Sequence, residues 1–270
     1  MLQFVEIKKI IALLGFLTLG YLVHGQDPIK KNFKVYNALL FKNTPDLTNY
    51  GFSKINMVYE DGVISTNYHV TDLKDTARRF IDYPKIAKAA SSAKASYMVP
   101  TCLDVEHWSL YDKKNYNYAV NKYVDLIKSY RKVDYNSLVS VFHYGSISQD
   151  IYNSSNVIYP CYYTHSSNIN EWIAMVKNSI LKIKKFGGKK PIYAFIWPQY
   201  NPEPGRNDLG YTFIDREMWK IQLETIYNLC DGVIIWSHYR DQNGNNIYFD
   251  VNMPWFQETL SFIKRHKIKS

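Results

Sequence analysis

The sequence is poor in the residues that mark several common activities. Its 270 residues include three cysteines, Cys102, Cys161 and Cys230, an odd number that cannot be fully paired within one chain. Each lies in or beside an apolar stretch, so we expect buried thiols. The motifs HExxH and GxSxG do not occur, and the seven histidines are not spaced as metal ligands. We therefore expect no catalytic metal and no cofactor.

Glycine and acidic residues are also sparse. There are 12 glycines, no phosphate loop of the form GxxxxGK[ST], and no glycine-rich turn after the first predicted strand. Asp and Glu number 24 against 33 Lys and Arg, which gives a net charge of +9. This balance suits an acidic partner such as a polyanionic polysaccharide, although a scatter of solvated lysines would give the same charge. No nucleic-acid recognition motif occurs, and we expect no nucleic-acid partner.

Long apolar runs are absent after the N-terminus. The first 25 residues hold a lysine pair, Lys8 and Lys9, an apolar run over residues 10–23, and the small Gly25. This is typical of a secretory signal peptide, residues 1–25, cleaved after Gly25, so we expect a secreted or periplasmic protein. An uncleaved membrane anchor is the alternative, although the run is short for a span of about 20 residues. We expect the mature chain, residues 26–270, to be one domain, a monomer, with no stable membrane anchor.

The rest of the sequence alternates between strand-like and helix-like segments. Several strand-like segments are continuous apolar runs, which is typical of parallel strands covered by helices. The order predicts an α/β fold, a single TIM-like (β/α) barrel with seven strands over residues 26–270, with an open doubly wound sheet as the alternative. The predicted strands cover residues 33–41, 54–59, 96–106, 137–145, 156–164, 191–200 and 231–238. The predicted helices cover residues 72–95, interrupted at Pro84, and residues 115–132, 169–187, 213–229 and 253–266.

Two carboxylates stand at the end of one predicted strand, in the stretch "YMVPTCLDVEHW". Alternate residues of a strand share a face, so Asp104 and Glu106 point one way while Leu103 and Val105 point to the helices. The carboxyl ends of barrel strands carry the chemistry of barrel enzymes. Burial and mutual repulsion raise carboxyl pKa values, and such an acid can protonate a glycosidic oxygen. Salt-bridged acids at a solvated strand end are the alternative.

Aromatic residues gather near the other predicted strand ends. Tyr144 is the fourth residue of "VFHYG", Tyr163 ends "YPCYY", Trp236 ends "GVIIW", Tyr200 ends "FIWPQY", and Trp108 follows the acid pair. Taken singly, each is more often a core or rim residue. Together they suit a sugar, whose apolar C–H faces pack on flat rings and whose hydroxyls bond tyrosine.

These runs together resemble the hyaluronidase family of glycoside hydrolases. That family has an Asp-x-Glu motif at a strand end, which Asp104-Val105-Glu106 matches, followed by an aromatic residue at the place of Trp108. The other three matches occur in the family's order along the chain: Tyr144, Tyr163 and Trp236. The resemblance implies a seven-stranded TIM-like barrel and a retaining, substrate-assisted β-N-acetylhexosaminidase.

The resemblance also implies roles for the matched residues. Glu106 would be the general acid/base, and Asp104 would orient the acetamido group of the substrate, which itself attacks the anomeric carbon. Tyr144 and Tyr163 would hydrogen-bond around that group and Trp236 would wall it. The expected substrate is a polysaccharide or oligosaccharide that contains N-acetylhexosamine, such as a glycosaminoglycan, and acidic glycans are included.

Two other readings remain open. A different barrel glycosidase could pair Glu106 with another acid, such as Asp208 or Asp231, although Asp231 begins its strand and would lie at the wrong end. A catalytically inactive, carbohydrate-binding barrel is the second. The acids Asp215 and Glu217 stand at a predicted helix start, where they complement the helix dipole and are expected to be structural.

Overall fold

The structure is a computed structural model that describes residues 32–65, 80–95, 98–106, 108–144, 147–202 and 209–270. Residues Phe33–Ser270 form one compact unit. The predicted signal peptide, residues 1–25, lies outside the described residues, as does most of the predicted helix before Pro84. No helix among the described residues is both long and apolar enough to cross a membrane.

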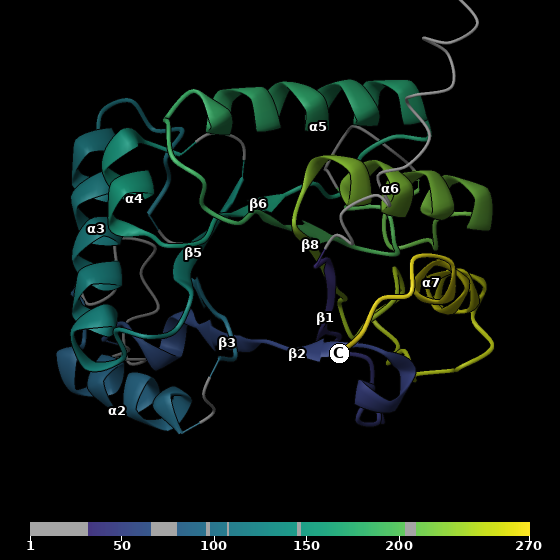
Figure 1. The fold of residues 1–270 in the computed structure, drawn as a ribbon, viewed down its shortest axis with the longest axis horizontal. Helices are drawn as coiled ribbons and strands as arrows, with labels where there is room; N and C mark the ends of the chain where they lie inside the picture. The colour runs from purple at the N-terminus through teal and green to yellow at the C-terminus, as the bar shows by residue number, and fades with distance from the viewer. Residues whose placement is uncertain (1–31, 66–79, 96–97, 107, 145–146, 203–208) are drawn as a thin grey trace, which may run out of the picture. The chain divides into compact units, whose positions relative to one another are not determined.

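Strands and helices alternate along the unit, as Figure 1 shows. The strands are β1 (Lys34–Ala38), β2 (Ser53–Lys54), β3 (Asn56–Tyr59), β4 (Thr101–Asp104), β5 (Val139–Tyr144), β6 (Tyr159–Cys161), β7 (Tyr193–Ile196) and β8 (Gly232–Trp236). The α-helices are α2 (Tyr83–Lys94), α3 (Tyr116–Val133), α4 (Gln149–Ser154), α5 (Ile169–Lys184), α6 (Arg216–Leu229) and α7 (Pro254–Arg265). Two short 3-10 helices, η1 (Thr48–Tyr50) and η2 (Glu60–Gly62), flank the short strands β2 and β3.

The strands form one parallel sheet that is nearly closed. Their order is β2-β1-β8-β7-β6-β5-β4-β3, and every pairing among these strands is parallel. The two edge strands are separated along the chain by Ile55 alone. The sheet therefore returns on itself as a TIM-like barrel, which confirms the predicted class and excludes the open sheet.

The strand count differs from the prediction, because there are eight strands and not seven. The predicted strand 54–59 is divided at Ile55 into β2, which pairs only with β1, and β3, which pairs only with β4. One apolar segment thus closes the barrel by bonding to a different neighbour along each half. A period-two pattern in the sequence cannot show that change of partner.

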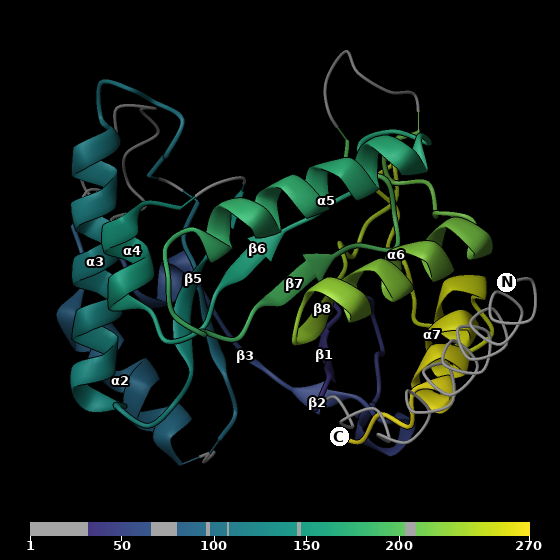
Figure 2. The same ribbon diagram turned by 45° about the horizontal axis from the view of Figure 1, so that its top comes forward.

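Two hydrophobic clusters separate the inside of the barrel from the helix layer. On β4, Cys102 belongs to the inner cluster and Leu103 to the outer one, to which Val105, the residue after the strand, also belongs. Figures 1 and 2 show the helices outside the strands. The predicted alternation of side chains on β4 is confirmed, and it turns Asp104 toward the barrel interior.

The helix starts follow local sequence signals. Asp82 accepts a hydrogen bond from the Lys85 backbone N–H (3.1 Å) at the start of α2, where Pro84 occupies the first turn. Asp215 accepts one from the Met218 N–H (2.9 Å) at the start of α6, and Glu217 follows in its first turn. The expected structural role of Asp215 and Glu217 is thereby confirmed.

Candidate active site

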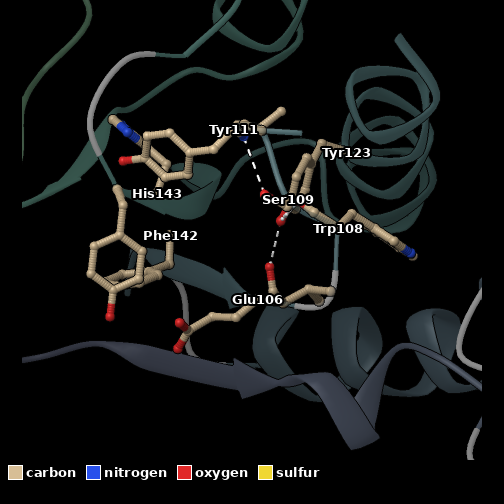
Figure 3. Close-up of a pocket in the computed structure, with 10 residues that line it drawn as sticks. Glu106, Trp108, Ser109, Tyr111, Tyr123, Phe142 and His143 are labelled. Atoms are coloured by element: carbon tan, nitrogen blue, oxygen red, sulfur yellow. Dashed lines mark hydrogen bonds between the residues drawn. The ribbon is translucent and has the colours of Figure 1, made fainter. Parts of the chain in front are cut away.

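The acid pair lies at the carboxyl end of β4. Asp104 is the last residue of the strand, paired in register with Tyr59 of β3, and Glu106 follows two positions later. The hydroxyl of Tyr123, on α3, donates hydrogen bonds to the carbonyls of Val105 (2.7 Å) and Trp108 (2.9 Å). These bonds hold the chain on both sides of Glu106 to a helix, so the carboxylate stands on a fixed backbone (Figure 3).

The surroundings of Asp104 disfavour its charged form. Its Oδ1 atom is buried and has no hydrogen-bond partner among the described residues. Burial is the largest cause, followed by the charges of Glu106 and Glu60, and together they raise the pKa of Asp104 to about 7. This carboxyl therefore titrates near neutral pH.

Glu106 has a raised pKa as well, although it stands at the exposed mouth. Partial desolvation of the carboxylate by the surrounding protein atoms is the main cause of the raised pKa, and the charge of Glu60 raises it further. A hydrogen bond from the Tyr144 hydroxyl to the carboxylate acts in the opposite direction. A carboxyl that keeps its proton closer to neutral pH can act as a general acid.

Glu60 is a third carboxylate at this end of the barrel, and the sequence reasoning missed it. It begins η2 directly after Tyr59, the last residue of β3. Its charge raises the pKa values of both Asp104 and Glu106. The signal was present in the sequence, because "VYED" places an acid at a strand end just as "CLDVE" does.

The structure brings Tyr144, Tyr163 and Trp236 together beside the acid pair. The Tyr163 and Trp236 rings stack with centres 5.5 Å apart, and Tyr144 meets Tyr163 edge-on at 6.3 Å. Trp197, just past β7, packs edge-on against Trp236 at 5.0 Å and extends the group. The pKa values of Tyr144 and Tyr163 are raised, by burial first and also by the nearby acids, so both hydroxyls remain donors.

Tyr59 also belongs to this end of the barrel and was not predicted. It is hydrogen-bonded to Trp236, and the charge of Asp104 adds to the burial that raises its pKa. The contact joins β3 to β8, two strands that are not neighbours in the sheet. No short motif in the sequence connects these two residues.

The remaining two predicted residues are placed differently. Trp108 is 4% exposed and packs edge-on against Tyr123 in the outer cluster, with ring centres 5.3 Å apart. Tyr200 is also buried in the outer cluster, where its hydroxyl lies 3.4 Å from the Met218 sulfur. The structure therefore does not bring Tyr200 to the acid pair.

A cavity of about 100 Å³ opens beside Glu106. Trp108 and Tyr123 line its helix side, and His143 and Tyr144 of β5 line its strand side. Ser109 and Tyr111 belong to the loop after β4, and the Tyr111 N–H donates to the Ser109 hydroxyl (3.2 Å) as drawn in Figure 3. The cavity is large enough for a few water molecules next to the candidate acid.

The potential metal ligands and the thiols of the described residues are the other candidates for chemistry at this site. No group of His, Cys, Asp or Glu in the part of the chain that the structure describes could hold a metal ion. Cys102, Cys161 and Cys230 are buried free thiols, as predicted. Burial raises the pKa values of Cys102 and Cys161, which keeps them as unreactive thiols.

Comparisons with known proteins give a likeness in structure alone. No model of a known protein family matches the sequence, and no curated protein matches it either. The structure is similar to that of bee venom hyaluronidase in complex with a hyaluronic acid tetramer, with a TM-score of 0.57 and 13% identity. That match covers 88% of this chain and 97% of the hyaluronidase chain, and a second structure of the bee enzyme matches with a TM-score of 0.54, 13% identity, and coverage of 88% and 98%. The chain therefore shares the fold of bee venom hyaluronidase.

Proposed function

We propose that the chain is a secreted glycoside hydrolase that cleaves glycans containing N-acetylhexosamine, with Glu106 as its general acid/base. One observation carries the proposal: Asp104 and Glu106, both with raised pKa values, stand together at the carboxyl end of a TIM-like barrel. Tyr144, Tyr163 and Trp236 lie beside them. The hyaluronidase with the same fold was solved with a hyaluronic acid tetramer, which supports an oligosaccharide as the ligand here.

In this proposal the substrate supplies its own nucleophile. The carbonyl oxygen of its acetamido group attacks the anomeric carbon while Glu106 gives its proton to the departing glycosidic oxygen. Asp104 holds the acetamido N–H and stabilises the positive charge that develops on the ring formed. Glu106, now a carboxylate, takes a proton from a water molecule that opens this ring, so the anomeric configuration is retained.

The aromatic group suits the acetamido sugar. The stacked faces of Tyr163 and Trp236 provide an apolar wall for the acetamido methyl group. The Tyr144 hydroxyl, which bonds Glu106, is placed to hold the acid and the sugar in one arrangement. These contacts would favour N-acetylated over simple hexosides.

Cationic side chains extend the site toward an acidic substrate. Tyr239 follows His238 just past β8, and the two rings stack with centres 4.8 Å apart. The Lys42 ammonium lies 4.8 Å from the Tyr239 ring centre and the Arg240 guanidinium carbon lies 5.3 Å from it. A sugar that bears a carboxylate or a sulfate would find both a flat ring and a positive charge there.

A second carboxylate partner for Glu106 is the alternative mechanism, and Glu60 is the observation that favours it. Its charge acts on both members of the pair. Of the acids considered from the sequence, Asp208 lies outside the described residues. Asp231 precedes β8 and accepts a hydrogen bond from the Ile192 N–H (2.9 Å), so it lies at the opposite end and is occupied.

An activity screen of residues 26–270 tests the proposal. The panel contains hyaluronan, chondroitin, chitin oligosaccharides and aryl β-N-acetylhexosaminides, and the Glu106→Gln variant is run beside the wild type. Loss of the general acid is expected to lower kcat about 10²–10⁴-fold. Binding of a glycan without cleavage by the wild type would replace this proposal with the inactive carbohydrate-binding barrel.

A Glu60→Gln variant separates the two mechanisms in the same screen. In the substrate-assisted mechanism it keeps most of its activity and changes the pH dependence. If Glu60 is the second carboxylate, its loss would be as severe as that of Glu106.

A further inference from the structure

We propose that a second glycan-binding surface lies beside the barrel mouth, formed by Phe80 and Tyr118 around the ammonium group of Lys122, together with Tyr83. Its ligand class is an anionic polysaccharide, and in this choice the inference rests on the proposed function. We refer to these four residues as the aromatic-lysine surface. None of them contributes to the acid pair or to its aromatic neighbours.

The three rings are exposed where apolar side chains would ordinarily be covered. Phe80 is 61% exposed, Tyr83 is 54% exposed and Tyr118 is 42% exposed. The nitrogen of Lys122 lies 5.5 Å from the Tyr118 ring centre and 6.0 Å from that of Phe80, so one cation joins two rings. A group of exposed rings on a soluble domain is a common mark of a binding surface, unlike scattered single ones.

The helix geometry fixes this arrangement. Tyr118, Lys122 and Asp125 follow the i, i+4, i+7 spacing of one stripe on α3, beside the buried face that packs on the barrel. The Tyr83 hydroxyl, at the start of α2, donates a hydrogen bond to the Asp125 carboxylate (2.8 Å). The Tyr83 ring is therefore already ordered, which lowers the entropy cost of binding.

The surface adjoins the mouth of the barrel. Glu60 begins η2, and the chain that follows reaches Ser65, whose N–H donates to the Phe80 carbonyl (3.0 Å). On α3, Lys122 is next to Tyr123, whose hydroxyl bonds the carbonyl of Val105 between the two acids. Short, hydrogen-bonded connections thus link the aromatic-lysine surface to both sides of the acid pair.

The chemistry of these side chains selects the ligand. A sugar ring packs its apolar C–H face on an aromatic ring, and the Lys122 ammonium can pair with a carboxylate or sulfate on the same chain. The net charge of +9 would draw a polyanion toward the protein. A polymer that occupies the mouth and this surface at once would bind more tightly than a short oligosaccharide, because the second contact is intramolecular.

Direct binding of the mature wild-type protein tests the surface. The probes are immobilised high-molecular-weight hyaluronan, chondroitin sulfate and neutral dextran at about 0.15 M salt, a salt level that screens surface charges beyond ~8 Å. The variants are Phe80→Ala with Tyr118→Ala, and Lys122→Gln. Tyr135→Ala is the matched control, since Tyr135 is 66% exposed and has the Lys94 nitrogen 5.7 Å from its ring centre, at the other ends of α2 and α3.

We expect the double variant to bind the anionic polymers roughly tenfold more weakly, because it loses two ring contacts and the intramolecular gain. Lys122→Gln should weaken binding of these polymers less than the double variant does, and Tyr135→Ala should bind them as the wild type does. Unchanged binding by the double variant would overturn the proposal. The proposal would also be overturned if Tyr135→Ala weakened polymer binding as much as the double variant does. The same holds if immobilised dextran retained the wild-type protein as well as the anionic polymers do.

Hydrolysis of an aryl β-N-acetylhexosaminide separates this inference from the proposed function. That small substrate reaches only the mouth, so its kcat/KM should be the same in the wild type and the double variant. If the wild type hydrolyses no substrate yet loses polymer binding through Phe80→Ala with Tyr118→Ala, the surface stands and the proposed function fails. If the wild type hydrolyses the aryl substrate and polymer binding does not depend on these rings, the proposed function stands and the aromatic-lysine surface fails.

Discussion

Asp134 and Asp104 are both withdrawn from water, but they lie at opposite ends of the barrel. Asp134, 2% exposed, follows α3 and precedes β5, where its carboxylate accepts hydrogen bonds from the Ser137 hydroxyl (2.5 Å) and N–H (3.3 Å). Asp104 ends β4 with a buried oxygen that has no hydrogen-bond partner among the described residues, and its pKa is raised to about 7. The Asp134 carboxylate is therefore satisfied by hydrogen bonds within the fold, whereas the Oδ1 atom of Asp104 has no such partner among the described residues.

The difference extends to neighbouring groups at each end. At the amino end of the sheet, Asp231 accepts a hydrogen bond from the Ile192 N–H, and Lys190 donates to the carbonyls of Tyr152 and Ser155. At the carboxyl end, the charges of Glu106 and Glu60 add to the burial that raises the pKa of Asp104, and the charge of Glu60 adds to the burial that raises the pKa of Glu106. Carboxyl pKa values raised in this way are concentrated at functional sites of proteins, which supports the role proposed for the carboxyl end.

Among the variants that test this comparison of the two ends, Asp104→Asn should have the largest effect. Activity should fall about 10²-fold or more, because the neutral amide stabilises the developing charge poorly. Stability should rise at alkaline pH, since a pKa change from 3.8 to about 7 corresponds to roughly 4 kcal/mol at about 1.4 kcal/mol per unit.

The raised pKa of Asp104 determines how the stability gain of Asp104→Asn should change with pH. Between pH 4 and 7 the folded wild type retains a proton on Asp104 that the unfolded chain has lost, so its stability falls as pH rises through this window. Urea unfolding at pH 4.5 and pH 8 should therefore show a stability gain for Asp104→Asn that is large at pH 8 and small at pH 4.5. A gain that is equal at both pH values would contradict the raised pKa.

Asp134→Ala should have the opposite effect on stability. Removing the carboxylate leaves the Ser137 hydroxyl and N–H without their acceptor, which is expected to cost about 2–3 kcal/mol. The measurement is the free energy of unfolding in urea, with kcat on the aryl substrate as the control. A fall in kcat without loss of stability would contradict the assignment of a structural role to Asp134 at the amino end of the barrel.

Glu60→Gln should give the smallest change and the most specific one. Removing this charge lowers the pKa values of Asp104 and Glu106 toward their ordinary values. In the proposed mechanism Glu106 must be protonated to act on the leaving group, so activity is lost as pH rises through its pKa. The alkaline limb of the pH–activity profile should therefore move to lower pH, by less than about one unit for a partly solvated neighbour. Movement to higher pH would disprove the electrostatic role of Glu60.

The sequence predicted the acid pair and three of its neighbours because their signals are local. Asp104 and Glu106 end a short apolar run, and Tyr144, Tyr163 and Trp236 each end another. The parallel order of the strands then brings all carboxyl ends to one end of the barrel. Tyr200 did not join them because its ring belongs to the outer cluster, as Ile196 does, whereas the inward-facing residue near the end of β7 is Trp197.

Tyr118 shows the same limit on a helix. It is 42% exposed on α3, although Val120 and Tyr123 of the same helix are buried. Helical periodicity gives a face with an uncertainty of about one residue position, because successive residues are separated by about 100°. Whether such an edge position is covered depends on the neighbouring helix, here α2.

By itself, the sequence determined the β/α alternation, the parallel strands and the position of the acid pair, because apolar runs and strand periodicity are local properties of the chain. Only the tertiary structure decided how the barrel closes, since β2 and β3 choose different neighbours along one continuous segment. It also decided that Glu60 and Tyr59 join the site, and that Lys122 stands between two exposed rings. These are contacts between segments far apart in the chain, and their energies depend on burial and distance, which no short motif contains.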